Sequence, residues 1–319
     1  MKNVKFLLFG FLALNMFLFT SCEDEVIVDP TPTPDPMNIV ETAVATDDLS
    51  TLVDALTQAN LVATLEGDGP FTVFAPTNAA FQALLDSEPS WNSLSDIDNS
   101  VLANVLKFHV LAADVKAADL TDSYVTALAT GPNDEQVSLQ IDVTGGVKFN
   151  GSASPSTTDI VTTNGTVHII DAVMLPPSVV NLALNNPAFS TLVAALTRTD
   201  MDFDYVGTLS GDGPFTVFAP TNDAFQALLD GNDDWASLGD IPLETLKAVL
   251  NYHVVSGANV QSDELVDNAE VTTLGGTVTI DLTDGAKIET TSGQSVPVVI
   301  ADVQGANGVV HAVGTVLLP

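Results

Sequence analysis

The sequence predicts an α+β fold that is built twice, one domain after the other. Segment 67–86 returns almost letter for letter as segment 211–230. Hydrophobic residues make up 46% of the 319-residue chain and charged residues 15%, a composition that favours globular domains over disorder. In each copy, helical patterns come first and most strand patterns follow, which favours an α+β domain over a doubly wound sheet.

The spacing of the repeat predicts two complete domains. It also relates three further pairs of positions: Trp91 and Trp235, Phe108-His109 and Tyr252-His253, and, after a one-residue slip, 164–168 and 307–311. This period is far longer than the roughly 20–50 residues of solenoid units, so each copy should bury a core of its own. We therefore expect domains at 37–176 and 177–319.

The N-terminus has the order of a secretory signal. Two lysines precede an apolar run over 6–19, which ends just before Cys22, the only cysteine. The run is short for a membrane-spanning helix, and a lone cysteine supports no disulfide framework. Residues 19–22 resemble a bacterial lipobox, with Phe19 in place of the usual aliphatic residue. We expect a signal peptide at 1–21 and acylation of Cys22, so that the membrane is reached through the lipid anchor only.

The segment 22–36 is predicted to be an extended tether. Its acidic triplet at 23–25 resembles the signal that sends lipoproteins of some Gram-negative bacteria to the outer face of the outer membrane. Alternate prolines over 29–36 favour an extended polyproline II conformation. The expected location is therefore outside the cell, on the bacterial outer membrane and exposed at its surface.

The chain is strongly acidic, with 8 Lys and Arg against 41 Asp and Glu and a formal net charge of −33. Loss of 1–21 would remove two lysines and leave 6 basic residues against 41 acidic ones, a charge of −35. A surface of this sign repels phosphate backbones, so nucleic acid is not an expected partner. A well-solvated exterior is the favoured explanation of the acidity, and attraction of cations or of a basic partner is the alternative.

Each copy begins with an amphipathic helix. Apolar residues at i, i+3, i+4 and i+7 start from Leu49 in the first copy and from Phe189 in the second. Asp47 or Asp48 is available to cap the first turn of the earlier helix.

A strand that leads into a helix comes next. The β-prone run 71–75 lies between prolines, and Thr77 then stands as N-cap before a helix over 78–86, with Thr221 in the same place in the second copy. Apolar spacing and turn residues predict a further helix and three strands in the first copy, at 97–106, 108–111, 137–143 and 167–175.

Three motifs, at 72–81, Phe108-His109 and 164–168, occur in order and twice, and together they resemble the fasciclin (FAS1) family. The resemblance implies two tandem FAS1-like domains, each a wedge or sandwich of short strands with helices packed at one end. It further implies extracellular adhesion through contact with a matrix protein or polysaccharide, with no catalysis and no cofactor. The tyrosine-histidine pair of the family corresponds to Tyr252-His253, whereas Phe108-His109 lacks the hydroxyl. These two pairs are candidate binding residues.

All four histidines lie at repeated positions, which raises the alternatives of a metal site and a structural role. The apolar surroundings of His168 and His311 favour a structural role, in which the imidazole bridges backbone groups. The sequence contains neither a zinc-binding His-x-x-x-His or cysteine cluster nor a Gly-x-Ser-x-Gly elbow. We therefore predict that the protein is not an enzyme.

The second copy gains four residues between its first helix and the repeated segment that starts at Gly211. This loop brings Phe203 and Tyr205 as candidate aromatic contacts. Asp200, Asp202 and Asp204 offer oxygens that suit Ca²⁺, but the glycine and distal glutamate of a calcium loop are missing. An ordinary loop at a helix end is the favoured interpretation over a metal site.

The leading hypothesis is a surface-anchored adhesion or binding lipoprotein that recognises an extracellular protein or glycan. Two alternatives stay open: an accessory subunit or hydrolase in surface carbohydrate capture, and a passive envelope spacer.

Overall fold

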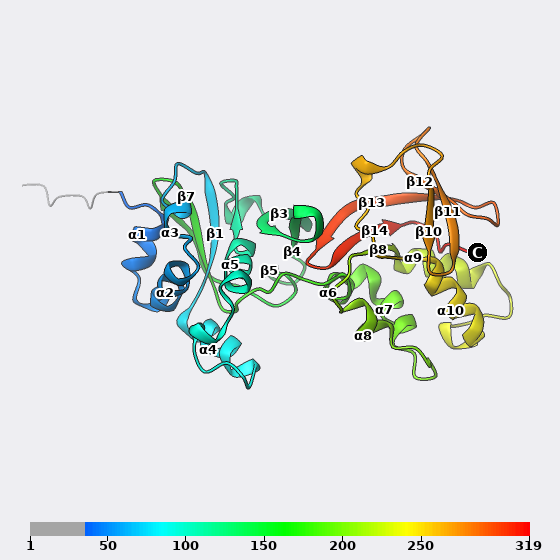
Figure 1. Ribbon diagram of the computed structural model, residues 1–319, viewed down its shortest axis with the longest axis horizontal. Coiled ribbons are helices and arrows are strands. Elements are labelled where there is room, and N and C mark those ends of the chain that lie inside the picture. Colours follow the sequence, from blue (N-terminus) through cyan, green and yellow to red (C-terminus); the bar gives the residue numbers. More distant parts are fainter. Residues whose placement is uncertain (1–35) are drawn as a thin grey trace, which may run out of the picture. The chain divides into compact units, whose positions relative to one another are not determined.

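A computed structural model describes residues 36–319 (Figure 1). The predicted signal peptide, Cys22 and all but the last residue of the predicted tether fall within 1–35, outside the described residues. Residues 36–319 group into one compact unit that contains both copies of the repeat.

The first copy starts with short helices and ends in strands. Its helices are α1 (Ile39–Val44), α2 (Ser50–Gln58), α3 (Val62–Leu65), α4 (Asn78–Ser87) and α5 (Asn99–Phe108), with 3₁₀ turns η1 (Asp47–Leu49), η2 (Leu94–Asp96), η3 (Ala117–Asp119) and η4 (Pro132–Asp134). Its strands are β1 (Phe71–Pro76), β2 (Val110–Leu111), β3 (Ser123–Thr130), β4 (Gln136–Asp142), β5 (Lys148–Phe149), β6 (Pro155–Thr162) and β7 (Gly165–Ile170).

The second copy repeats this order. Its helices are α6 (Val179–Asn185), α7 (Ser190–Leu196), α8 (Tyr205–Leu209), α9 (Asn222–Asp230) and α10 (Leu243–Tyr252), with 3₁₀ turns η5 (Pro187–Phe189), η6 (Leu238–Asp240) and η7 (Ser262–Glu264). Its strands are β8 (Phe215–Pro220), β9 (Val254–Ser256), β10 (Glu270–Thr273), β11 (Gly276–Asp281), β12 (Lys287–Glu289), β13 (Ser295–Gly305) and β14 (Gly308–Val313).

Each copy folds its strands into one mixed seven-stranded sheet. The orders are β5-β4-β3-β2-β1-β7-β6 and β10-β11-β12-β13-β14-β8-β9. In both, the first and last strands pair in parallel, β1 with β7 and β8 with β14. If the two edges of each sheet were joined, the order of equivalent strands would be the same in both copies. The sheets differ in their edge strands, which are β5 and β6 in the first copy and β9 and β10 in the second.

The outer hairpin differs in length between the copies. In the first copy β3 and β4 are eight and seven residues long and are joined through η4, whereas β10 and β11 are four and six residues long and meet in a tight turn. The longer hairpin is fastened to α5, because the Asn104 side chain accepts from Thr130 N at 3.0 Å and donates to Thr130 O at 3.1 Å. Ala248 stands at the corresponding position of α10.

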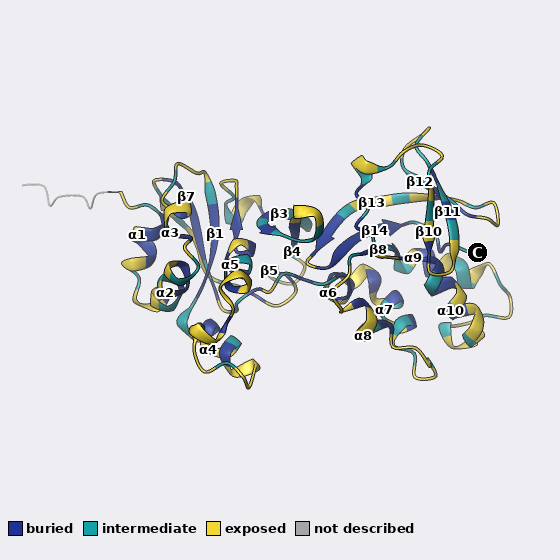
Figure 2. Ribbon diagram, viewed as in Figure 1, coloured by how far each residue is buried: buried dark blue, intermediate teal, exposed yellow. Residues whose placement is uncertain are grey.

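The buried residues fall into four apolar clusters among the described residues, two in each copy (Figure 2). In each copy one cluster lies between the helices and the sheet, and the other lies among the strands. No cluster takes its buried members from both copies, so each copy of the described chain has cores of its own, as the repeat predicts.

Most predicted elements are confirmed. The strand at 71–75 is β1, the helix at 78–86 is α4, and the strand at 137–143 is β4, each within one or two residues. The strand predicted at 167–175 is β7, which ends at Ile170.

Two predictions are wrong. Phe108 ends helix α5, and His109 is its C-cap, so a strand begins only at Val110. Neither Asp47 nor Asp48 caps the helix that follows, because α2 has no side-chain cap at its N-terminus and the N–H of Thr51 instead donates to Asn78. In the first case the helix continues through the predicted strand. In the second, a side chain from another helix takes the place of the predicted cap.

Candidate functional site

The repeated threonines begin corresponding helices. Thr77 Oγ1 accepts a hydrogen bond from Ala80 N at 3.1 Å at the N-cap of α4. Thr221 Oγ1 accepts from Ala224 N at 3.3 Å at the N-cap of α9. Each satisfies one of the backbone N–H groups that a helix start leaves without an intrahelical partner.

The asparagine after each threonine joins two helices. Asn78 Oδ1 accepts from Thr51 N at 2.8 Å, and its Nδ2 donates to Asp47 O at 3.0 Å. Asn222 makes the same pair of bonds with the backbone at the start of α7, at 2.9 Å each. The one sign of this role in the sequence is the exact repetition of Thr-Asn at 77–78 and 221–222.

The Asn-Gly motif at the start of β7 ties the end of the first copy to its beginning. Asn164 Oδ1 accepts from Ile39 N at 3.0 Å, and Nδ2 donates to Leu65 O at 2.7 Å and to Gly67 O at 2.8 Å. Asn307 repeats all three bonds in the second copy, at 2.9, 2.8 and 2.7 Å. Both side chains use their full amide and have a scaffold role.

The glycine of the motif is required by the close pairing of β7 with β1. A Cβ atom on Gly165 would lie 1.9 Å from Phe71 O, and one on Gly308 would lie 2.2 Å from Phe215 O. Only glycine lets the last strand begin this near the first.

His109 and His253 lie inside the fold. The side chain of His109 is 1% exposed and that of His253 is 2% exposed. Nε2 of His109 accepts from Met174 N at 2.9 Å, so its Nδ1 carries the proton and donates to Val105 O at 2.8 Å. His253 makes the equivalent bonds with the backbone of its own copy, at 2.9 and 2.7 Å. Each ring links the end of a helix to the C-terminal segment of its copy.

Burial keeps these two imidazoles neutral. Desolvation lowers the pKa of His109 and of His253 to about 4, although the backbone carbonyl that each ring contacts opposes the change. At neutral pH both rings therefore act as one donor and one acceptor, which matches the two backbone groups that they bridge.

The aromatic residues before these histidines are also in the core. Phe108 is 0% exposed and Tyr252 is 1% exposed. The Tyr252 hydroxyl donates to Thr277 O at 2.7 Å and accepts from Thr291 N at 3.2 Å, which joins α10 to the outer strands. The candidate binding residues Phe108-His109 and Tyr252-His253 are thus buried, and their polar side-chain atoms are paired inside the domain.

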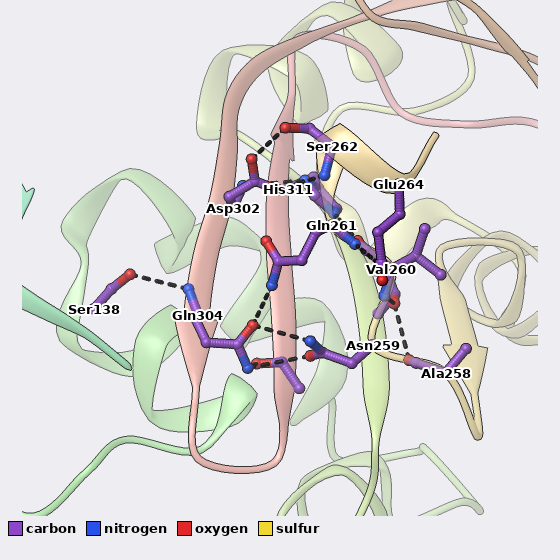
Figure 3. Close-up of polar contacts among 12 residues, drawn as sticks. Ser138, Ala258, Asn259, Val260, Gln261, Ser262, Glu264, Asp302, Gln304 and His311 are labelled. Carbon is purple, nitrogen blue, oxygen red and sulfur yellow. Dashed lines mark hydrogen bonds and ion pairs between the residues drawn. The ribbon is translucent and has the colours of Figure 1, made fainter. Parts of the chain in front are cut away.

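His168 and His311 hold the bulged strand beside them. Nδ1 of His168 accepts from Asp159 N at 3.3 Å, and its Nε2 contacts Val115 O at 3.0 Å. His311 contacts Asp302 N and a backbone carbonyl in the same way (Figure 3). Burial lowers the pKa of His311, while that carbonyl and the nearby Asp302 carboxylate oppose the change. Both rings have only backbone partners within hydrogen-bond distance.

The three aspartates of the second-copy loop have separate partners. Asp200 forms an ion pair with Arg198 at 2.6 Å, and Asp202 forms one with Lys247 at 2.9 Å. The side chain of Asp204 instead caps α8 through Gly207 N at 2.8 Å. Within the described part of the chain, no group of three or more His, Cys, Asp or Glu side chains is arranged to hold a metal ion.

The two aromatic residues of this loop differ in exposure. Tyr205 is 2% exposed, and its hydroxyl donates to Asn251 Oδ1 at 2.9 Å. Phe203 is 42% exposed and packs edge-on against the Tyr205 ring, with the ring centroids 4.6 Å apart. The structure therefore presents Phe203 at the surface and uses Tyr205 as its support.

A buried polar network lies where the second copy contacts the first (Figure 3). The Gln304 amide exchanges two hydrogen bonds of 3.1 Å with Asn259 and accepts another from Gln261 Nε2. Its backbone N–H donates to Ser138 Oγ of β4 at 3.0 Å. The sequence analysis missed this contact, whose partners lie 166 residues apart.

A second feature that the sequence analysis missed is a cleft beside β3 and β4. Its volume is about 440 Å³, and Tyr124, Gln140 and Asp142 line one wall. Asn186 Nδ2 donates to the Tyr124 hydroxyl at 2.9 Å from the opposite wall. Burial raises the pKa of Tyr124, and the bond from Asn186 opposes that change.

No single helix of residues 36–319 has the length and apolar character needed to cross a membrane. The neighbouring segments Val179–Asn185 and Pro187–Leu196 pass by length and composition together, but the chain bends by 101° between them.

Comparison with known proteins finds the same family in both copies. The model of the fasciclin domain matches residues 47–176 and 187–319. Protein sll1483 from Synechocystis sp. is 35% identical over 168 residues, which cover 53% of this chain and 89% of that protein. Transforming growth factor-beta-induced protein ig-h3 from Sus scrofa is 30% identical over 258 residues, 80% of this chain but only 35% of the pig protein.

Among solved structures, a match with 17% sequence identity and a TM-score of 0.49 covers 88% of this chain and 96% of the other. That structure is a FAS1 domain pair from fasciclin I, which is described as an insect cell adhesion molecule.

Proposed function

The chain belongs to the fasciclin family, and on this premise we propose that it is a surface-anchored lipoprotein that binds an extracellular matrix protein or polysaccharide through its two FAS1 domains. FAS1 domains are found in adhesion and matrix-binding proteins. The lipobox-like residues that end at Cys22 and the proline-rich segment after it support attachment to the outer membrane. Two domains on one tether would raise avidity wherever both engage the same surface.

The observation that carries the proposal is the exposed, well-supported ring of Phe203. The Arg198–Asp200 ion pair steadies the loop that leads to this residue, and so does the ion pair of Lys247 with Asp202, which directly precedes Phe203. Arg198 Nη1 also donates to Leu238 O at 2.9 Å. An aromatic side chain that is already held in place loses little conformational entropy on binding, which is typical of residues that dominate interfaces.

The proposal predicts that Phe203→Ala weakens binding to the attachment surface about thirtyfold or more, because truncation of an aromatic anchor typically removes about 2 kcal/mol or more of binding free energy. The measurement is the number of bacteria retained on surfaces coated with matrix proteins or polysaccharides, compared with wild type and with a gene deletion. Leu274→Ala is the matched control, because Leu274 is 50% exposed in the same copy but lies in the turn between β10 and β11.

Attachment that survives deletion of the gene would overturn the adhesion role and favour a passive spacer. Attachment that is lost on deletion but unchanged in Phe203→Ala would support the adhesion role and show that the partner binds a surface other than Phe203.

A further inference from the structure

The cleft beside β3 and β4 lies on one face of the long hairpin of the first copy. Side chains alternate along a strand, so Gln140 and Asp142 project from the same face of β4. Tyr124 lies directly opposite Gln140 on β3 and shares that face. Asn186 and Ile300 of the second copy line the other wall. We call this space the Gln140 cleft.

The Gln140 side chain is buried without a partner. It is 7% exposed, and its Oε1 accepts no hydrogen bond from the described residues. A buried amide oxygen in this state opposes folding, because it has given up its bonds to water and gained none. The amide also carries two N–H donors, which suit a ligand group that accepts hydrogen bonds.

Two carboxylates are held in fixed positions beside it. Asp142 Oδ1 accepts from Thr144 N at 2.7 Å. Asp122 Oδ1 accepts from Val143 N at 2.7 Å, and its Oδ2 accepts from Thr144 Oγ1 at 3.2 Å. Carboxylate oxygens can accept more than one bond each, so both groups still offer acceptor positions to a ligand.

The charge of the lining restricts the ligand. The residues that line the cleft include these two aspartates and no lysine, arginine or histidine. A phosphate, sulfate or uronate would therefore meet unopposed negative charge in a partly enclosed space. A lone basic side chain would pair with the carboxylates but would leave the amide donors of Gln140 unmatched.

Hydroxyl groups meet both requirements, because each one can donate to a carboxylate and accept from an amide N–H of Gln140. Tyr124 and Ile300 add apolar surface for the C–H faces of a sugar ring. The volume of about 440 Å³ falls within the roughly 300–1,000 Å³ of small-molecule sites. We propose that the Gln140 cleft binds an uncharged saccharide. This inference rests on the proposed binding function and names its ligand class and site.

The test uses the full-length protein, purified in mild detergent, and isothermal titration calorimetry. The probes are neutral hexasaccharides of glucose, mannose and galactose, with oligogalacturonate as the anionic counterpart. Wild type is expected to bind at least one neutral probe and not the anionic one. Gln140→Leu is expected to weaken that binding at least tenfold, because leucine lacks the amide donors. The melting temperature should not fall, because leucine fills a similar volume and removes the unpaired buried oxygen.

A matched pair of variants separates the cleft from local structure. Asp142→Asn and Asp281→Asn remove the same charge, and both aspartates accept from the N–H of a threonine two residues later, at 2.7 and 2.9 Å. Only Asp142 lines the cleft. The saccharide affinity is expected to fall in Asp142→Asn and to stay unchanged in Asp281→Asn.

Each contrary result overturns the inference. These results are the absence of binding to every neutral probe, preference for the anionic probe, equal affinity in Gln140→Leu, or a melting temperature that falls in Gln140→Leu together with binding. None of them decides the adhesion role, which the attachment assay with the gene deletion and Phe203→Ala measures independently.

Discussion

His109 and His253 are titratable residues that the fold keeps uncharged. Their folded-state pKa is lowered to about 4, whereas an exposed imidazole in the unfolded chain titrates near 6.5. Between these values the unfolded chain binds more protons than the folded one. The stability that each histidine contributes is therefore fully present above pH 6.5 and is lost as the pH falls towards 4.

We predict that the free energy of unfolding falls by about 1 kcal/mol for each of these histidines between pH 7 and pH 5.5. In this window most carboxylates stay ionised, so the histidines dominate the slope. His253→Gln keeps one donor and one acceptor for the backbone but does not titrate, and it should flatten the slope of the transition of the second copy. Urea unfolding at several pH values measures this, and an unchanged slope would assign the pH dependence to other groups.

The structural role of a residue could be predicted from local sequence only where its hydrogen-bond partner is near along the chain. The N-cap role of Thr77 follows from its position three residues before Ala80. The partners of Asn164 lie 97 to 125 residues away, so no window of neighbouring residues reveals them. Gln140 gave no signal either, because the cleft that it lines is completed by Asn186 and Ile300 of the second copy.

Among secondary-structure elements, α5 shows why the strand at 108–111 was predicted wrongly. The run Phe108-His109-Val110-Leu111 is apolar enough for a strand, but the stripe of Leu102, Val105 and Leu106 carries the helix on to Phe108. His109 then closes the helix through its bond to Val105 O. A short apolar run does not by itself distinguish the end of a buried helix from a strand.

The junction of α4 with α2 leads to a prediction about helix packing. Asn78→Ala removes two hydrogen bonds to the backbone at the start of α2 and should lower the free energy of unfolding by about 1–2 kcal/mol. Gln82→Ala is the control on the same helix, because it removes only an exposed bond to Asp86 and should change stability by about 0.5 kcal/mol or less. Thermal or urea denaturation compares them, and equal effects would contradict the role of Asn78.

For the whole molecule, the repeat correctly predicted two α+β domains with separate cores. It did not predict that the two sheets have different edge strands, β5 and β6 in the first and β9 and β10 in the second. The edge is set by which strands form hydrogen bonds in the folded domain. The repeat also did not predict the unequal hairpins, because they lie in segments where the two copies differ in sequence and length. The residues that differ between copies, at Phe203 and in the Gln140 cleft, are the ones on which both proposals rest.

The predicted lipid anchor is tested at this scale. Cys22→Ser should move the protein from the membrane fraction to the soluble fraction and remove it from the cell surface, because the acyl chains supply the attachment. Detergent phase partition and labelling of intact cells measure the two effects. A serine variant that stays in the membrane fraction would contradict the lipobox interpretation.

The bond from Gln304 to Ser138 has a consequence for the evolution of the chain. Its donor lies on the bulged strand β13 and its acceptor on the long hairpin, yet at the position of Gln304 the first copy has Val161, which is 73% exposed. The shorter hairpin of the second copy has no equivalent extension. If the two copies exchanged places along the chain, neither the donor nor the acceptor of this bond would be in position. The copies arose by duplication, but their later differences allow this contact only in their present order.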